Sequence, residues 1–222
     1  MTDKTDNRDR ILAAVGVLAI IAIIVTVSVV LSRGSSSDYQ DMTPARLDDI
    51  HQNTQSLVFG NPSADEQVDV VLEPMCPACH EFMGAYITRS LKNRLHSGKT
   101  VLRIYPVSYL SSNGSSDRVI TAWYSMYIAD TSDMKMDSLN TIVATLPRLS
   151  FNIMQPDLAE MYGVKQATLT DPDTMTAAGK LSEDGKIIVH MLSKKDRATP
   201  IVIRNGTIIT TSHQAKKLVQ GQ

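Results

Sequence analysis

The chain has 222 residues, of which 43% are hydrophobic and 20% are charged, and its net charge at pH 7 is −1. This composition is typical of a globular domain and excludes a disordered or fibrous chain. Nucleic-acid binding rests on clustered Lys and Arg side chains that neutralise phosphates, so the balanced charge argues against a nucleic-acid-binding protein.

The first informative segment, Ile11 to Ser32, contains no charged residue. As a helix it is roughly 33 Å long, enough to cross the hydrocarbon core of a membrane. A cleaved signal peptide is the alternative, but its apolar core is usually about 7–15 residues long and ends at an A-x-A-like site. The segment is longer than that and offers no such site. We therefore expect residues 11–32 to be an uncleaved transmembrane signal anchor.

Basic residues on the two sides of this span favour one orientation. They are Lys4, Arg8 and Arg10 before the span, and Arg33 and Arg46 after it. Because the flank richer in Lys and Arg usually stays in the cytoplasm, residues 1–10 are predicted to be cytoplasmic and the rest extracytoplasmic. The protein is then a single-pass protein of the cell membrane, and its cysteines face an oxidising compartment, where disulfides persist.

Residues 33–56 are predicted to form a linker and a lead-in helix. The segment GSSSD is typical of a flexible linker. Thr43 followed by Pro44 is typical of a helix start, with threonine as the N-cap and proline in the first turn. After a predicted loop, FGNPSADEQ, the β-branched run Val68 to Pro74 predicts a strand.

The following residues predict a strand–helix–strand unit. The cysteine motif comes directly after the strand, and apolar residues then recur at helical spacing up to a predicted stop at Gly98. Thr100 to Leu110 predicts a second strand that ends near Pro106. The cysteines therefore lie at the turn between the first strand and the helix.

The remaining chain predicts helices followed by a hairpin. Residues from about 113 to 195 are mainly helical in pattern, and TPIVIRNGTIITT predicts two strands around the turn Asn205-Gly206. Ser212 begins a predicted short terminal helix. Residues 57–222 are accordingly predicted to form one mixed α/β domain with a helical insertion.

Both cysteines lie in the stretch EPMCPACHEF, which fits three kinds of site. Cys76 and Cys79 have the C-x-x-C spacing of a redox dithiol. Together with His80 they match the C-x-x-C-H signature of c-type haem attachment, and the three side chains could equally be zinc ligands.

The position of the motif favours the redox dithiol. At a helix start, free N–H groups and the helix dipole stabilise a thiolate at Cys76, and Cys79 lies one turn further on, where it can attack a mixed disulfide. Pro77 suits this first turn because its missing N–H has no partner there. We expect Cys76 to be the exposed nucleophile and Cys79 the shielded resolving thiol.

Haem and zinc fit the surrounding sequence less well. A c-type cytochrome needs a second axial ligand in a compact helical domain, and the predicted strands do not match one. A structural zinc site needs four ligands, and the sequence has no second Cys or His pair. An inert structural disulfide across two residues closes a tiny loop and stabilises little. We therefore expect no metal and no cofactor.

Two segments of the chain resemble the DsbA-like thiol–disulfide oxidoreductases, namely GNPSADEQVDVVLEPMCPACHEF and RATPIVIRNGTI. The resemblance covers roughly Leu57 to Ile209. It implies a thioredoxin-like central sheet with an inserted helical subdomain, preceded here by the transmembrane helix. It also implies that Pro200 follows a cis peptide bond beside the dithiol, and that Thr199 and Pro200 hold a substrate strand there.

Four residues near the dithiol raise further questions. Ala78 stands where the familiar DsbA centre has histidine, which removes a donor or positive charge near the thiolate. Thr199 resembles the residue of disulfide isomerases more than the valine of DsbA, so the direction of the redox reaction stays open. Glu73 is either a proton-transfer group or, as we expect, a solvated carboxylate at a strand end. His80 either tunes the thiolate or, as we expect, is a solvated bystander.

The resemblance implies an extracytoplasmic enzyme that introduces or rearranges disulfides in secreted or surface proteins by exchange through the CPAC dithiol. Its expected partners are reduced or unfolded secreted proteins and a membrane reoxidant of the DsbB or vitamin K epoxide reductase type. Three alternatives remain open. They are a thioredoxin-fold reductase, for example in cytochrome c maturation, a c-type haem electron carrier using CPACH, and a binding module whose cysteines are incidental.

Overall fold

The computed structural model describes residues 44–191 and 198–209. The predicted span at residues 11–32 and the predicted helix beginning at Ser212 lie outside the described residues. Within the described ranges, no helix has both the length and the apolar character needed to cross a membrane.

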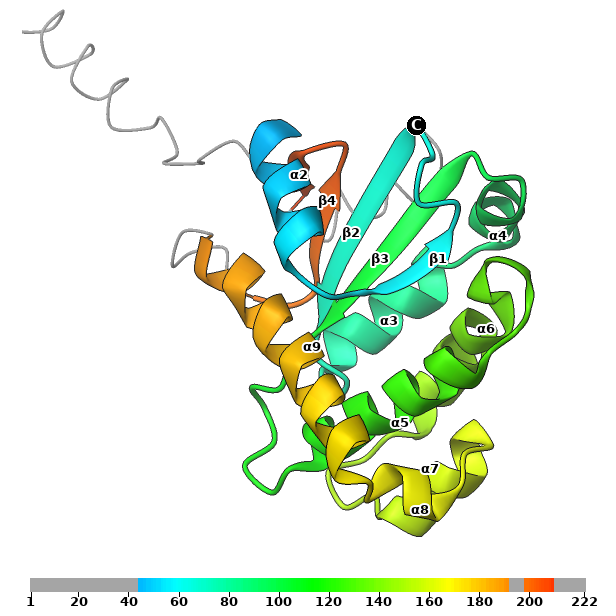
Figure 1. The fold of residues 1–222 in the computed structure, drawn as a ribbon, viewed down its shortest axis with the longest axis vertical. Helices are drawn as coiled ribbons and strands as arrows, with labels where there is room; N and C mark the ends of the chain where they lie inside the picture. The colour runs from blue at the N-terminus through cyan, green and yellow to red at the C-terminus, as the bar shows by residue number, and fades with distance from the viewer. Residues whose placement is uncertain (1–43, 192–197, 210–222) are drawn as a thin grey trace, which may run out of the picture. The chain divides into compact units, whose positions relative to one another are not determined.

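A five-stranded sheet forms the centre of the domain (Figure 1). The strands are β1 (Leu57–Gly60), β2 (Glu66–Leu72), β3 (Thr100–Pro106), β4 (Ile201–Arg204) and β5 (Thr207–Ile209). Their order is β1-β3-β2-β4-β5, with β2 and β3 parallel and the other neighbouring pairs antiparallel. This mixed sheet with an inserted helical segment is consistent with the predicted thioredoxin-like fold.

Helices cover both faces of the sheet, which explains why its central strands β2 and β3 are rich in apolar and β-branched residues and largely buried. Successive side chains of β2 point to opposite faces. Val70 packs in one core with α3 (Pro77–Tyr86), whereas Val71 packs in a second core with α2 (Pro44–Asn53). Figure 1 shows these two helices on opposite sides of the sheet.

The single helix predicted after the cysteine motif is wrong, because the chain breaks there into α3 and α4 (Arg89–His96). Thr88 causes the break, since its side chain accepts a hydrogen bond from Leu91 N at 3.3 Å and caps the new helix. The predicted stop is confirmed: Gly98 follows the end of α4 with a φ of +70°.

Strand boundaries also differ from the prediction. Residues 57–60 form the edge strand β1, paired through Leu57 and Ile104, where we predicted the end of a lead-in helix and a loop. β2 begins at Glu66 rather than Val68. β3 ends at Pro106, as predicted. A strand of four residues is too short for an alternating pattern to reveal, and its pairing partner lies far along the chain.

Helices occupy the chain between β3 and β4, as the sequence pattern predicts. They are α5 (Ser115–Ala129), α6 (Met136–Thr145), α7 (Gln155–Tyr162), α8 (Gln166–Leu169) and α9 (Pro172–Met191). The buried Trp123 indole donates to the Tyr162 hydroxyl at 2.8 Å, and Thr145 Oγ1 lies 3.1 Å from the same hydroxyl. One buried polar contact therefore joins α5, α6 and α7.

The predicted hairpin is confirmed. Asn205 and Gly206 both have positive φ, +47° and +81°, as a two-residue turn with the twist of the flanking strands requires. The Asn205 side-chain oxygen accepts from Gln67 N at 2.8 Å, which fixes the turn against β2.

Two glycines of α9 should respond in opposite ways to alanine. A Cβ at Gly185 would lie 2.7 Å from the Pro106 carbonyl oxygen, because α9 crosses the end of β3 closely, whereas a Cβ at Gly179 meets nothing within 4 Å. We expect Gly185→Ala to lower the free energy of unfolding by about 1–3 kcal/mol. Gly179→Ala should raise it by about 0.5–1 kcal/mol. Urea unfolding of both variants measures the difference, and equal effects would contradict this packing.

Candidate active site

The two cysteines lie where β2 leads into α3. Cys76 is the N-cap residue of α3, with extended backbone angles, and Pro77 occupies the first turn. The N–H groups of Cys79 and His80 donate to the Cys76 carbonyl oxygen at 3.0 and 3.1 Å, so the helical hydrogen bonds of α3 begin at its N-cap residue. The Cys76 side chain thereby lies at the positive end of the helix, as the sequence indicates.

The two thiols of this turn differ sharply in acidity. Hydrogen bonding from the Cys79 thiol is the largest influence on Cys76; burial opposes it, while main-chain N–H groups of Cys79 and Ala78 and the Thr199 contact act with it. Together they lower the pKa of Cys76 to about 5. Burial is the largest influence on Cys79 and raises its pKa, and the neighbouring Cys76 raises it further. The pair therefore holds one thiolate and one protonated thiol at neutral pH.

Cys76 is less accessible to solvent than we predicted. The Cys76 residue is 8% exposed and Cys79 is fully buried, while Pro77 and Ala78 between them are exposed. The predicted exposed nucleophile is therefore corrected to a nearly buried one, beside a Cys79 that is fully shielded.

Thr199 and Pro200 reach the dithiol from the far end of the chain. The Thr199–Pro200 peptide bond is cis. Cys76 Sγ lies 3.6 Å from the Thr199 carbonyl oxygen, across a sequence separation of 123 residues. The antiparallel pairing of β2 with β4, in which Val71 lies opposite Ile201, brings the segments together. The structure thus places Thr199 beside Cys76, with the cis peptide bond to Pro200 directly after it.

Glu73 does not have the solvated position that we predicted. It is fully buried, and its carboxylate accepts four hydrogen bonds. The donors are Met75 N, Tyr109 N, Leu110 N and the Ser116 hydroxyl. Tyr109, Leu110 and Ser116 escaped sequence analysis because the contacts run through main-chain groups and a common hydroxyl, which leave no motif.

His80 is half-buried rather than a solvated bystander. Its Nε2 atom lies 2.5 Å from the Pro74 carbonyl oxygen, so the ring is bonded back to its own turn. Haem attachment needs a free axial nitrogen and two sulfurs that a porphyrin can reach. The engaged ring and the buried Cys79 fit that chemistry poorly.

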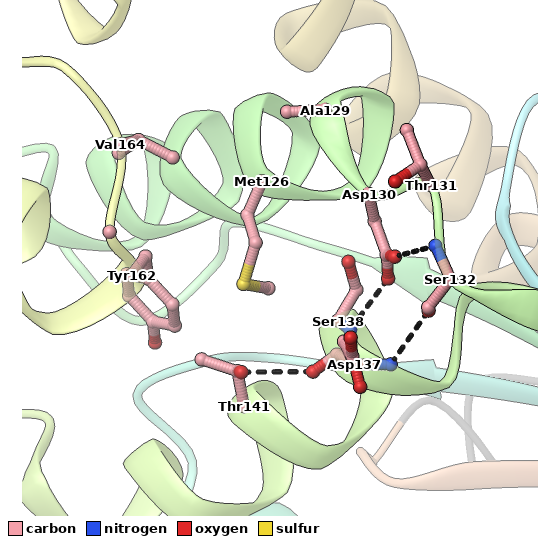
Figure 2. A pocket seen from close by; sticks show the side chains of 11 residues that line it. Met126, Ala129, Asp130, Thr131, Ser132, Asp137, Ser138, Thr141, Tyr162 and Val164 are labelled. Carbon is pink, nitrogen blue, oxygen red and sulfur yellow. Dashed lines mark hydrogen bonds between the residues drawn. The ribbon is translucent and has the colours of Figure 1, made fainter.

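A polar pocket of about 400 Å³ lies elsewhere, in the helical insertion (Figure 2). Both carboxylate oxygens of Asp130 are used within the protein there, since they accept from Ser132 N and Ser138 N at 2.7 Å each. Burial raises the pKa of Asp130, but these hydrogen bonds outweigh it and lower the pKa to about 2. Asp130 therefore satisfies a main-chain N–H in the first turn of α6 and is no candidate catalytic base.

Comparison with known proteins gives a match at the level of fold. No family model and no curated protein matches the sequence. The thiol-disulfide exchange protein alpha-DsbA2 from Wolbachia pipientis matches with a TM-score of 0.60 at 15% identity, over 80% of this chain and 93% of that one. MdbA, a thiol-disulfide oxidoreductase from Corynebacterium matruchotii, matches with 0.58 at 18% identity, over 82% and 98%.

DsbA from Chlamydia trachomatis also matches, with a TM-score of 0.58 at 18% identity, over 74% of this chain and 88% of that one. The chain has the fold of these DsbA-like proteins. At such identities the likeness establishes the fold, and the chemistry rests on the residues of this chain.

Proposed function

We propose that this protein is a thiol–disulfide oxidoreductase that donates its Cys76–Cys79 disulfide to reduced, unfolded secreted or surface proteins. The observation that carries the proposal is the asymmetry of the pair. Cys76 lies at a helix start with its pKa lowered to about 5, and Cys79 is buried beneath it with its pKa raised. The shared fold with MdbA, a thiol-disulfide oxidoreductase, and with alpha-DsbA2, a thiol-disulfide exchange protein, supports it.

The reaction proceeds in two exchange steps. First, a substrate thiolate attacks Cys76 Sγ, the Cys76–Cys79 bond breaks, and its electron pair goes to Cys79, which takes up a proton because its pKa is raised. A second thiolate of the substrate then attacks the substrate sulfur of the mixed disulfide, and Cys76 leaves as a thiolate. The substrate loses two electrons and gains a disulfide, and the protein keeps the two electrons as a dithiol.

The low pKa of Cys76 favours this direction. A sulfur with a low pKa leaves a mixed disulfide faster, and a stabilised thiolate makes the reduced protein the favoured product. Thr199 contributes by position, since its carbonyl group lies beside Cys76 and is available to pair with the main chain of an extended substrate.

Turnover requires an external electron acceptor. The chain has two cysteines in all, so it holds no further dithiol to take the two electrons from Cys76 and Cys79. We therefore propose a membrane reoxidant of the DsbB or vitamin K epoxide reductase type. Residues 11–32 would anchor the protein to the extracytoplasmic side of the cell membrane, beside that partner.

Single-turnover disulfide transfer tests the proposal. The oxidised full-length chain is mixed with a reduced, unfolded secreted protein, and thiols on both are counted by mass spectrometry after alkylation. We expect the substrate to lose two thiols for every two that the chain gains. An inert oxidised chain, together with a reduced chain that opens substrate disulfides, would instead indicate a reductase. No mixed disulfide in either direction would indicate a binding module.

A further inference from the structure

Glu73 makes contacts through both its main chain and its side chain, and the two sets reach different parts of the site. Its carbonyl oxygen accepts from Cys76 N at 3.0 Å. Its main chain also acts to lower the pKa of the Cys79 thiol, against the larger effect of burial. The backbone of this one residue therefore contacts Cys76 directly and influences the acidity of Cys79.

The side chain of Glu73 holds that backbone in place. Oε2 accepts from Tyr109 N at 2.6 Å and from Leu110 N at 3.3 Å, both in the segment after β3. Oε1 accepts from Met75 N at 3.2 Å and from the hydroxyl of Ser116, in the first turn of α5. One carboxylate therefore joins three segments: the dithiol turn (residues 73–79), the segment after β3 and the start of α5.

These contacts argue against a proton-transfer role. A general base needs an oxygen that faces the reacting atom. Each carboxylate oxygen of Glu73 already has two donors, and none of them is a cysteine sulfur. No Lys, Arg or His of the described part of the chain forms an ion pair with it. A buried carboxylate without a cation depends on such hydrogen bonds, so this arrangement tolerates little displacement.

We propose that Glu73 is a positioning residue, whose side-chain hydrogen bonds hold the main chain that contacts Cys76 in the geometry needed for exchange. This inference rests on the proposed function. It adds Glu73 as the residue that sets the reactivity of the nucleophile Cys76. The donors that stabilise a Cys76 thiolate belong to the turn that Glu73 fixes, so loosening the carboxylate misaligns them.

The test compares variants of the reduced full-length chain by the rate at which iodoacetamide alkylates Cys76 across a pH series. Glu73→Ala removes all four acceptor contacts, and we expect alkylation at pH 6 to become about tenfold slower as the titration moves upward. Glu73→Gln should slow alkylation less than Glu73→Ala does, because its oxygen can accept from Tyr109 and Leu110 and its amide can donate to the Ser116 hydroxyl, while the contact from Met75 N is lost.

Asp184→Asn is the matched control. Asp184 is also a buried carboxylate that accepts a main-chain hydrogen bond, from Gln55 N at 2.8 Å, but it lies in α9. It should lower stability and leave the alkylation profile of Cys76 unchanged.

Two results would overturn the proposal. An unchanged profile in Glu73→Ala would show that Glu73 only stabilises the fold, as Asp184 does. Faster alkylation in both Glu73 variants would show that its charge, not its hydrogen bonds, acts on the thiolate. Should Glu73→Ala not fold, Ser116→Ala decides: slower alkylation at pH 6 supports the proposal, and an unchanged rate overturns it. Alkylation by iodoacetamide needs no protein substrate. The positioning role of Glu73 is therefore tested independently of whether the chain transfers its disulfide to a protein.

Discussion

Cys76→Ser is expected to reduce disulfide transfer to a substrate roughly 10³-fold or more, to the rate of the uncatalysed reaction. A hydroxyl can form no disulfide, and Cys79, fully buried and with a raised pKa, offers no replacement nucleophile. The rate is measured as the loss of substrate thiols over time, detected by alkylating samples quenched at intervals.

Cys79→Ser is the matched control, because it removes the other sulfur of the same turn. Its Cys76 thiolate should still attack disulfides, but nothing within the chain can then resolve the product. Covalent complexes linked through Cys76 should therefore accumulate and disappear on reduction. Accumulation in Cys76→Ser instead, or in neither variant, would contradict the assigned roles.

Alkylation of Cys76 in the reduced wild-type chain is expected to reach half its maximum rate near pH 5. The thiolate is the reactive form, and hydrogen bonding from the Cys79 thiol, offset in part by burial, lowers the pKa of Cys76 from 9.0 to about 5. Between these two pH values an ordinary cysteine would remain mostly protonated. A profile centred near pH 9 would contradict the thiolate geometry.

The same difference in pKa makes the stability of the reduced form depend on pH. Between about pH 5 and pH 9 the unfolded chain binds a proton at Cys76 that the folded chain does not, so stability rises with pH across this window. The contribution is fully present above pH 9 and is lost as the pH falls through 5. The oxidised chain has no Cys76 thiol and should lack this pH dependence. Urea unfolding of the oxidised and reduced chains across a pH series therefore measures the contribution of Cys76 to the free energy of unfolding.

The dithiol turn could be predicted from the sequence because its determinants are local. A β-branched strand, a proline in the first helical turn and the spacing of Cys76 and Cys79 act over a dozen residues. The hairpin was predictable for the same reason, since Asn205 and Gly206 suit positive φ. The break at Thr88 was missed because apolar spacing continues across it, and only the cap shows where one helix ends.

The surroundings of the dithiol could not be predicted in this way. The donors to Glu73 from Tyr109, Leu110 and Ser116 lie 36, 37 and 43 residues away, and the contacts depend on how the segment after β3 folds back over β2. The position of Thr199 beside Cys76 followed from the family resemblance alone. The burial of Glu73 could not be predicted from its polar side chain. Its carboxylate is stabilised mainly by main-chain N–H groups, which occur in every sequence and leave no recognisable pattern.

The reduction potential of the Cys76–Cys79 pair, measured by equilibrating the full-length chain with glutathione buffers, tests the proposed direction of exchange most directly. A pKa of about 5 for Cys76 lies between about 7 for thioredoxin and about 3.5 for DsbA. We therefore predict a potential between about −270 mV, the value for thioredoxin, and about −120 mV, the value for DsbA. A potential at or below about −270 mV would contradict a disulfide donor and would make the protein a reductase.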